Sequence, residues 1–278
     1  MKKAAVVVSL LLVFTVLMAI NYQAIFFYFS DLLLEDTINL LLVGIDAASE
    51  DGIRTDTLMV LNIDIRELKI NLLSIPRDTM IDLPGQEGYD KINDAYSQAG
   101  IDLTKQVIEE KIGICIDYYL EVNYDGFVGV VETLGGVELE VEERMDYVDK
   151  AGGLNIDLEP GIQTLNGEEA LDYARFRDRY TGDIGRIKRQ QKLIQAGMEQ
   201  FLVLETASKV PDLIGQAKEH LKTDLGFFKS LGLGFRLQNL DLDRVETALL
   251  PGEADYIDGV SYWVPDWSQV KEVVDPIS

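Results

Sequence analysis

The chain opens on a long apolar run. After two lysines near the start, no charged residue precedes Asp31, and residues 4–20 are almost entirely apolar. Aromatic side chains then gather over residues 22–29. A helix that crosses a bilayer core needs about 20 apolar residues, and aromatic residues are enriched where such a helix meets the lipid headgroups. The pattern predicts a transmembrane anchor within residues 1–30.

The charges on either side of this run predict its orientation. Lys2 and Lys3 precede it, and acidic residues begin at Asp31. Because positive charge stays on the cytoplasmic side of a span, residues 31–278 are expected to form an extracellular domain of a single-pass type II membrane protein. A cleaved signal peptide and a buried core helix are the alternatives. The run is long for a signal peptide and lacks a small-x-small cleavage site, and its terminal position disfavours a core helix.

Beyond the anchor, apolar residues come in short runs separated by polar turns. Residues 38–45 form a nearly continuous apolar run, which is typical of a buried strand. Residues 57–64 and 68–75 repeat this pattern on either side of a short polar turn at 65–67. Further strands are expected at 117–122, 137–141 and 245–250.

Helical patterns lie between these strands. Two consecutive glycines mark the end of a helix expected over 124–134, because glycine accepts the left-handed conformation that often ends helices. Asn166 and Glu169 have the spacing of a capping box, which predicts a short helix through Ala174. Helices are also expected at 91–99, 103–112 and 184–202, with one or two more towards the carboxyl terminus, the last from Asp266.

These strands and helices are mixed along the chain without a strict repeat. No low-complexity linker divides the sequence after the anchor. The chain has 278 residues, of which 47% are hydrophobic, so it can form a sizeable core. We expect one α/β domain, a three-layer α/β/α sandwich with a central mixed β-sheet.

Composition narrows the kinds of partner and metal. The chain has 48 acidic against 25 basic residues and a net charge of −23. A nucleic-acid-binding protein needs a basic surface, so no nucleic acid partner is expected. The sequence contains one cysteine, Cys115, and one histidine, His220, which excludes a zinc site built on several such ligands. Any metal is expected to be a hard cation bound by oxygen.

Two aspartates flank the loop between the first two predicted strands. Asp46 ends the first strand, and Asp56 begins the second. If these strands are neighbours, both carboxylates lie at one edge of the sheet, where they repel each other unless a cation intervenes. Mg²⁺ is bound in this way, by one or two carboxylates together with substrate phosphates. The alternative is that both aspartates only cap turns.

Two further clusters follow the third predicted strand. Arg77 comes directly after its end, at what would be the same sheet edge; the alternative is an exposed pair with Asp78, which is worth little energy. Lys91 and Asn93 lie at the start of a predicted helix, where free backbone N–H groups favour anions. Here the alternative is a helix cap with a solvated lysine.

Positive charge is concentrated in one later segment. Arg186, Arg189 and Gln190 lie on one face of the predicted helix, near its amino terminus, and an extended segment would project Arg175 and Arg177 to one side. Arginine suits phosphate because its planar guanidinium donates hydrogen bonds in pairs. Like charges this dense cost stability without a counter-anion, which favours a phosphate site over a solvated basic patch. The basic residues of this segment are Arg175, Arg177, Arg179, Arg186, Lys188 and Arg189.

Taken together, the clusters resemble the LytR-CpsA-Psr family over about residues 39–201. The resemblance implies an enzyme that moves an anionic glycopolymer, such as teichoic acid or capsular polysaccharide, from a polyprenyl-pyrophosphate carrier to peptidoglycan. It also implies contact with membrane lipid. Five ordered motifs carry it: Leu-Leu-Val-Gly-Ile-Asp46, Arg54-Thr-Asp56-Thr, Ser74-Ile-Pro-Arg77-Asp, Lys91-Ile-Asn93-Asp-Ala-Tyr, and the run from Tyr173 through Arg186 to Gln191.

The resemblance also implies roles for individual residues. Asp46 and Asp56 match carboxylates that bind Mg²⁺, with Mn²⁺ as the alternative ion. Asp183 matches a carboxylate before the arginine helix and is the candidate base, or else a structural partner of Arg186; Arg77 is the other catalytic candidate. An apolar tunnel for the prenyl chain is implied, but its residues look like ordinary core. Substrate-binding roles fall on Arg54, Arg77, Lys91, Asn93, Arg175, Arg177, Arg186, Arg189 and Gln190.

The expected enzyme is a Mg²⁺-dependent phosphotransferase or ligase. Arginines and the cation would neutralise the leaving polyprenyl pyrophosphate while a muramic-acid hydroxyl attacks the sugar carbon. Two alternatives stay open. One is a prenyl-pyrophosphate phosphatase that uses water as the acceptor, and the other is a membrane-bound regulator or lipid-binding protein without turnover.

Overall fold

The computed structural model describes residues 34–46, 54–86, 88–149, 154–178, 180–203 and 221–274. The anchor expected within residues 1–30 lies outside this part of the chain. Among the described helices, none is both long and apolar enough to cross a membrane.

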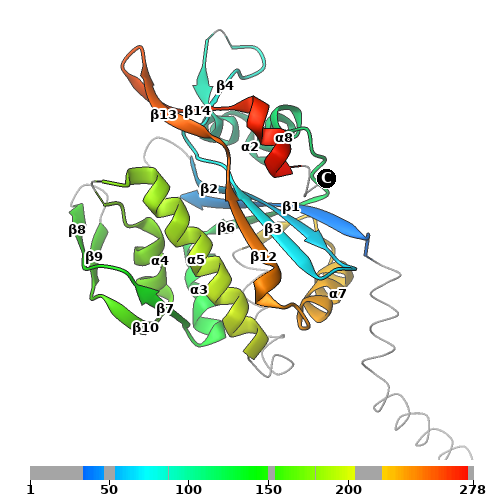
Figure 1. The fold of residues 1–278 in the computed structure, drawn as a ribbon, viewed down its shortest axis with the longest axis vertical. Helices are drawn as coiled ribbons and strands as arrows, with labels where there is room; N and C mark the ends of the chain where they lie inside the picture. Colours follow the sequence, from blue (N-terminus) through cyan, green and yellow to red (C-terminus); the bar gives the residue numbers. More distant parts are fainter. Residues whose placement is uncertain are drawn as a thin grey trace, which may run out of the picture.

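A six-stranded sheet forms the middle layer of the molecule (Figure 1). The second and third strands of the chain are antiparallel to their predecessors, whereas two pairs of non-consecutive strands run parallel. The sheet is therefore mixed, as the sequence predicts. In spatial order its strands are β11 (Leu221–Thr223), β6 (Tyr118–Asn123), β1 (Thr37–Asp46), β2 (Arg54–Asp64), β3 (Lys69–Ser74) and β12 (Val245–Leu249).

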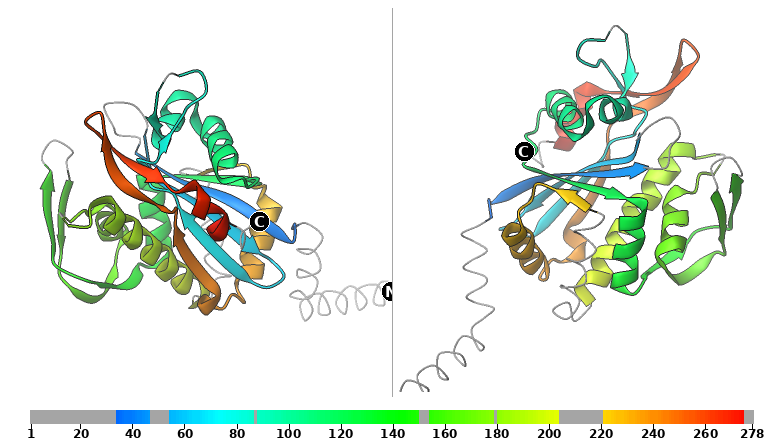
Figure 2. Two further views of the ribbon diagram at one scale, coloured as in Figure 1. Left: turned by 45° about the horizontal axis from the view of Figure 1, so that its top comes forward. Right: turned by 180° about the vertical axis from the view of Figure 1, so that it is seen from behind.

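Helices cover both faces of this sheet, which confirms the predicted sandwich (Figures 1 and 2). One face carries α2 (Ile92–Ile112) and α8 (Trp267–Val274). The other face carries α3, α5 and α7, and α4 packs against α3 and α5. The bounds of these four helices are Tyr124–Leu134 for α3, Gly167–Arg175 for α4, Gly182–Val203 for α5 and Phe227–Leu237 for α7.

The continuous apolar runs of the central strands follow from this layering. Along β1, Leu41 and Val43 belong to the core beneath α2, whereas Leu40 and Leu42 belong to the core on the side of α7. Successive side chains of a strand point to opposite faces. A strand buried on both faces therefore cannot alternate apolar with polar residues.

The local helix signals are confirmed. Asn166 and Glu169 form the expected capping box of α4, and Gly135 ends α3 in the left-handed conformation, with φ of 87°. The helices expected at 91–99 and 103–112 are joined into α2 with a kink at Ala99 and Gly100, where Gly100 has φ of 69°. Positive φ is strained for most residues, so the glycine permits the kink.

Four small hairpins or strand pairs were only partly predicted. The sequence predicts β7 but not the other seven strands of these pairs. Lys91, expected at the start of a helix, belongs to the short strand β5 that precedes this helix. These strands expose many of their side chains, so they lack the apolar runs that reveal the central strands. The pairs are β4 (Met80–Ile81) with β5 (Asp90–Lys91), β7 (Val137–Val141) with β10 (Gly161–Leu165), β8 (Met145–Asp149) with β9 (Leu154–Leu158), and β13 (Gly252–Ile257) with β14 (Val260–Pro265).

One edge of the sheet collects the ends of several strands. β1 is parallel to β6 and antiparallel to β2, and β2 is antiparallel to β3. The carboxyl ends of β1, β3 and β6 therefore lie at the same edge as the beginning of β2. Ligands of open α/β sheets commonly bind at such an edge.

Candidate active site

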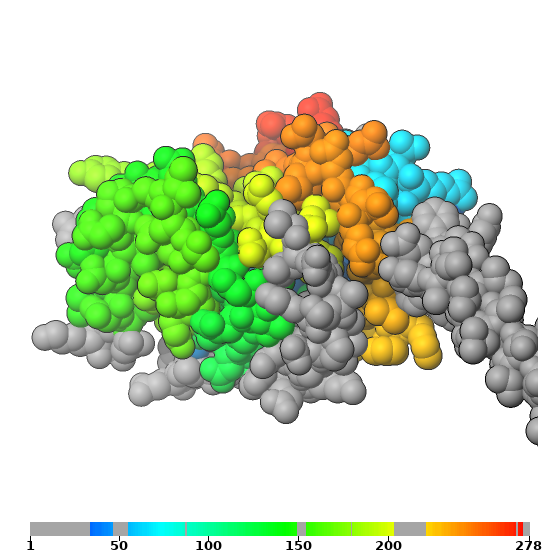
Figure 3. Space-filling view, turned by 90° about the horizontal axis from the view of Figure 1, so that it is seen from below, coloured from blue at the N-terminus to red at the C-terminus, as the bar shows by residue number. Residues whose placement is uncertain are grey.

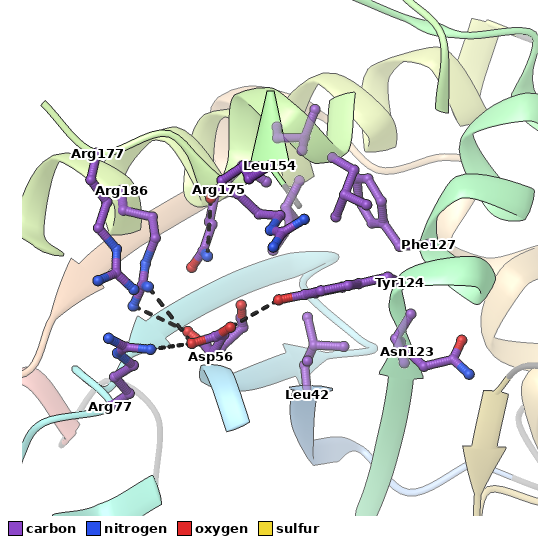
Figure 4. A pocket seen from close by; sticks show the side chains of 18 of the residues that line it. Leu42, Asp56, Arg77, Asn123, Tyr124, Phe127, Leu154, Arg175, Arg177 and Arg186 are labelled. Carbon is purple, nitrogen blue, oxygen red and sulfur yellow. Dashed lines mark hydrogen bonds and ion pairs between the residues drawn. The ribbon is translucent and has the colours of Figure 1, made fainter. Parts of the chain in front are cut away.

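The carboxylate of Asp56, the third residue of β2, lies at the centre of this edge. Its Oδ1 pairs with the guanidinium of Arg77, beyond the end of β3, and lies 3.7 Å from Nη1 of Arg186 on α5. Its Oδ2 accepts a hydrogen bond of 2.9 Å from the hydroxyl of Tyr124, the first residue of α3. Figure 4 shows these side chains converging on Asp56. Four segments far apart in sequence therefore meet at one carboxylate.

Asp183, in the first turn of α5, forms a second acidic centre. Its Oδ1 lies 2.7 Å from Nη2 of Arg186 and 3.8 Å from Nε of Arg77. The same oxygen lies 3.9 Å from Nη2 of Arg177. Arg77 and Arg186 each contact both Asp56 and Asp183, so the two carboxylates hold the two guanidinium groups side by side.

Several buried polar atoms in this cluster lack hydrogen-bond partners. The side chain of Arg186 is only 3% exposed, and within the described part of the chain no group accepts a hydrogen bond from its Nε–H or from that of Arg77. An unsatisfied buried donor costs about 1–3 kcal/mol. The two oxygens of Asp183 also accept no hydrogen bond from the described residues. This cluster favours a ligand that accepts hydrogen bonds from guanidinium groups, and phosphate does so well.

Burial and neighbouring charges shift several pKa values here. Burial raises the pKa of Asp183, although Arg77 and Arg177 oppose that rise. Burial lowers the pKa of Arg177, and the charge of Arg77 adds to the effect. Burial also raises the pKa of the Tyr124 hydroxyl, and the carboxylate of Asp56 raises it further. Asp183 therefore takes up a proton more readily than an exposed aspartate, whereas Tyr124 stays a hydrogen-bond donor.

Arg77, Arg177 and Tyr124 line a cavity of about 570 Å³ between the sheet and α3, α4 and α5, whereas Asp183 is not among its lining residues. The guanidinium of Arg175 lies 4.7 Å above the ring of Tyr124. Arg175 is the last residue of α4 rather than part of an extended segment, but both it and Arg177 reach the cavity, as expected. The polar part of the lining consists of Asp56, Thr57, Arg77, Asn123, Tyr124, Tyr147, Arg175, Arg177, Arg186 and Gln190.

A second cavity, of about 380 Å³, lies between the sheet, α3, α5 and α7. Its lining is entirely apolar, and it shares Phe127, Leu193 and Ile194 with the first cavity. Figure 3 shows this side of the molecule, with α5 between the green residues of α3 and the orange residues that follow α7. The two cavities are therefore adjacent, one with a cationic wall and the other purely hydrophobic.

Two residues of α5 that are predicted to bind substrate lie in different surroundings. Gln190 lines the first cavity, and its side-chain amide lies 3.4 Å from the carbonyl oxygen of Ala174. Arg189 does not line it. Its Nη2 donates to the carbonyl oxygen of Phe176 at 2.9 Å, and its guanidinium lies 5.1 Å from the centre of the Phe176 ring. These contacts fasten the segment after α4 to α5, and a phosphate-binding role for Arg189 stays a prediction.

Lys91 and Asn93 lie behind Arg77 rather than along the cavity lining. The Lys91 ammonium is 2.9 Å from Oδ1 of Asp78, and the backbone N–H of Asn93 donates to the carbonyl oxygen of Arg77 at 3.2 Å. Both residues therefore support the loop that carries Arg77. Direct contact between either side chain and a substrate stays a prediction.

Asp46 and Arg54 face each other in the pairing of β1 with β2. The charge of Asp46 contributes to the raised pKa of Tyr124, whose hydroxyl donates to Asp56. The side chain of Arg54 lies outside the described part of the structure. Within that part, no cluster of three or more histidine, cysteine or acidic residues could hold a metal by itself. Two carboxylates and ligand phosphates are the set that Mg²⁺ uses.

Tyr124 is the functional candidate that the sequence analysis missed as a site residue. It carries no charge at neutral pH and belongs to none of the charged clusters that indicate the site in the sequence. Its place along the chain could have indicated a role in the site, because Tyr124 follows the carboxyl end of β6, the parallel neighbour of β1. Side chains at such strand ends commonly contact ligands.

Comparisons with known proteins identify relatives of this chain. The chain is 32% identical over 253 residues to a protein of Oceanobacillus iheyensis named polyisoprenyl-teichoic acid–peptidoglycan teichoic acid transferase TagU, covering 88% of this chain and 76% of that protein. It is also 34% identical over 206 residues to the regulatory protein MsrR of Staphylococcus aureus, covering 72% of this chain and 61% of that protein.

Solved structures show the same fold. The crystal structure of Bacillus subtilis TagV matches with a TM-score of 0.77 and 30% identity, over 88% of this chain and 97% of that one. A structure of TagT bound to LIIa-WTA matches with a TM-score of 0.71 and 30% identity, over 87% and 91% of the two chains. The LytR_cpsA_psr family profile matches residues 21–276. The chain therefore belongs to the LytR_cpsA_psr family, as its five motifs predict.

Proposed function

We propose that this protein is a transferase that moves an anionic glycopolymer from a polyprenyl-pyrophosphate carrier to peptidoglycan at the outer face of the cytoplasmic membrane. The observation that carries the proposal is the adjacency of an arginine-lined cavity and an apolar one, which share Phe127, Leu193 and Ile194. A ligand that fits both has an anionic head and a long hydrocarbon tail. The name of the related TagU protein supports the same substrate class.

The guanidinium groups would bind the diphosphate head. Arg77, Arg177 and Arg186 point towards one region of the cavity (Figure 4). The Nε–H groups of Arg77 and Arg186 lack acceptors within the described residues, so a phosphate oxygen would satisfy them without breaking an existing hydrogen bond. Such preorganised donors stabilise charge that develops during group transfer, which is commonly the largest catalytic effect.

The proposed reaction is phosphoryl transfer. An acceptor hydroxyl of peptidoglycan attacks the phosphorus that carries the sugar, the new O–P bond forms, and the P–O–P bridge breaks to release polyprenyl phosphate. This route differs from the attack at the sugar carbon expected from sequence. The arginines would neutralise phosphate oxygens in either route, and in this one they would also stabilise the oxygens of the transferred group.

Asp183 is the proposed base for the acceptor proton. Its carboxylate oxygens accept no hydrogen bond within the described chain, and burial raises its pKa towards the range that suits a base. Its 2.7 Å contact with Arg186 also supports the structural role that the sequence left open. Positioning Arg186 and accepting a proton are compatible roles for one carboxylate.

Asp46 and Asp56 would hold Mg²⁺, with Mn²⁺ as the alternative. Asp46 ends β1 and Asp56 is the third residue of the neighbouring antiparallel strand β2, so both lie at the same sheet edge, and hard oxygen ligands suit either ion. When bound, the cation would supply further neutralisation of phosphate charge. Asp56 also pairs with Arg77 and Tyr124, which keeps its carboxylate oriented towards the cavity.

Product analysis on the full chain tests this function. The protein in vesicles would receive a lipid-linked donor, with or without peptidoglycan. Phosphoryl transfer yields glycopolymer on peptidoglycan and polyprenyl phosphate, whereas attack at the sugar carbon yields polyprenyl pyrophosphate. Cleavage that is equally fast without peptidoglycan would instead identify the phosphatase. Binding without any turnover would identify the regulator, the alternative that the name of the related MsrR protein favours.

A further inference from the structure

Two phenylalanines at the start of α7 are exposed to solvent. The side chains of Phe227 and Phe228 are 52% and 63% exposed, and their rings meet edge to face with centroids 5.4 Å apart. The helix also contributes Leu237 to the apolar cavity. The proposed reaction does not use the aromatic pair, and keeping two adjacent phenylalanines in water is unfavourable.

The pair lies beside the point where the chain enters the domain. Lys229, the next residue, contacts Oε1 of Glu35 at 2.6 Å, and the hydroxyl of Tyr118 donates to the same oxygen at 3.1 Å. The Lys229 ammonium also lies 4.9 Å from the centre of the Tyr118 ring. Leu34 packs on the same core as Leu225, just before α7. Figures 1 and 2 show the beginning of β1 next to α7 from opposite sides.

The length of the preceding chain limits how far this corner can lie from a membrane. The expected anchor ends in an aromatic band whose last member is Phe29. Only four residues separate Phe29 from Leu34, and even a fully extended chain of this length spans roughly 17 Å. With Glu35 bound to Lys229, the amino terminus of α7 must stay close to the lipid headgroups whenever the anchor spans the bilayer.

The charges around the pair are compatible with such contact. Glu35 is neutralised by Lys229, and Asp36 pairs with Arg66 at 2.6 Å. Asp224 accepts a hydrogen bond of 2.8 Å from the backbone of Tyr119. Moving this corner towards lipid would therefore bury few unpaired charges, which are the groups that are costly to remove from water.

We propose that Phe227 and Phe228 insert into the lipid headgroup region and dock the domain on the bilayer. The inference rests on the proposed membrane anchor. Docking presents the α7 side of the domain, where the apolar cavity lies, to the membrane that holds the prenyl chain. The occupant of this surface is the lipid bilayer itself rather than a protein partner.

Spin labelling of the full chain in vesicles of phosphatidylcholine and phosphatidylglycerol tests the contact without turnover. Cys115→Ser removes the native thiol, and Phe228→Cys supplies one label site. The control is Tyr256→Cys, at an exposed aromatic residue on β13. We expect the label at position 228 to be accessible to oxygen and protected from a nickel complex, and the label at 256 to show the reverse. Equal exposure to nickel at both positions would overturn the proposal, as would protection that requires native membranes with their proteins.

Transfer kinetics give a second readout. The double variant Phe227→Ser/Phe228→Ser should raise KM about tenfold for a long-chain donor in vesicles, because two aromatic rings no longer enter lipid. It should leave a short, water-soluble donor unaffected, and Tyr256→Ser should change neither. An equal loss with both donors would overturn the docking role. Absence of transfer by the unaltered chain would instead contradict the proposed function, while the labelling result would still stand.

Discussion

The two adjacent cavities form the two ends of the candidate site and show opposite designs. At the sheet edge, Arg77 and Arg186 are held by the carboxylates of Asp56 and Asp183, and some of their donors lack hydrogen-bond acceptors in the described chain. At the other end, apolar side chains from α3, α5 and α7 leave a space with no polar feature. Charge recognises a head group with directional bonds, whereas hydrocarbon is recognised by shape and desolvation alone. Substitutions at the two ends should therefore fail in different ways.

The largest effect is expected from the arginines. Arg186→Ala or Arg77→Ala should each lower transfer by about 10³-fold, because each removes preorganised positive charge from the leaving phosphate. Circular dichroism should show a folded domain in both variants. Arg144→Ala is a matched control, since that arginine is exposed and does not line the cavity. Full activity of Arg186→Ala would contradict the phosphate-binding role of this end.

Asp183→Asn should lower kcat about 10²-fold, which is within the usual contribution of a general base. Because burial raises the pKa of Asp183, the acidic limb of the pH–kcat profile should lie above that of an ordinary aspartate. The variant should lose this limb. A variant that keeps both the rate and the limb would leave Asp183 only a structural role.

The raised pKa of Asp183 also predicts that Asp183→Asn does not lower stability, although it lowers activity. The folded state binds the Asp183 proton more tightly than the unfolded state, so ionisation of this group opposes folding above its folded pKa. Asp183→Asn should therefore keep or raise the free energy of unfolding at neutral pH, even though transfer falls. Urea unfolding at neutral pH and at a pH below the ordinary pKa of an aspartate checks the sign, because Asp183 is then protonated in both the folded and the unfolded state and the difference should vanish.

At the apolar end, Gly197→Leu should change binding of the tail without affecting the head. A Cβ built on Gly197 meets no atom within 4 Å, and the residue lines the apolar cavity. Leucine also favours the helix over glycine, so α5 should not be weakened. We expect KM to rise about tenfold for a long prenyl donor and little for a short one. An equal change in KM for the two donors would show that the tail does not enter this space.

The smallest effect is expected at the tyrosine that donates to Asp56. Tyr124→Phe keeps the ring beneath Arg175 but removes the hydroxyl that donates to Asp56 at 2.9 Å. One such hydrogen bond is worth about 1 kcal/mol, so transfer should fall only about fivefold. Steady-state kinetics with one donor would measure it. A loss as large as that of Arg186→Ala would assign Tyr124 a direct part in the reaction.

Much of the fold could be predicted because the central strands and main helices have strong local signals. The run at 38–45, the capping box at Asn166 and the glycines after α3 each report their structure without help from distant residues. The hairpins β8–β9 and β13–β14 could not be predicted in this way. Their stability comes from pairing rather than from a buried apolar run, and exposed strands carry little periodic signal.

The sequence by itself determined the chemistry of the cationic end, since clustered arginines in an acidic chain are visible before any folding. It also determined the family and the mixed sandwich. Only the tertiary structure decided which residues line the cavity. In the folded chain Arg189 contacts Phe176, Lys91 lies behind Arg77, and Tyr124 donates to Asp56. The tertiary structure also decided which apolar residues line a cavity and which fill the core, because the same types of apolar residue occur in both places. Charge is a property of residues, whereas empty space arises only from how distant segments pack.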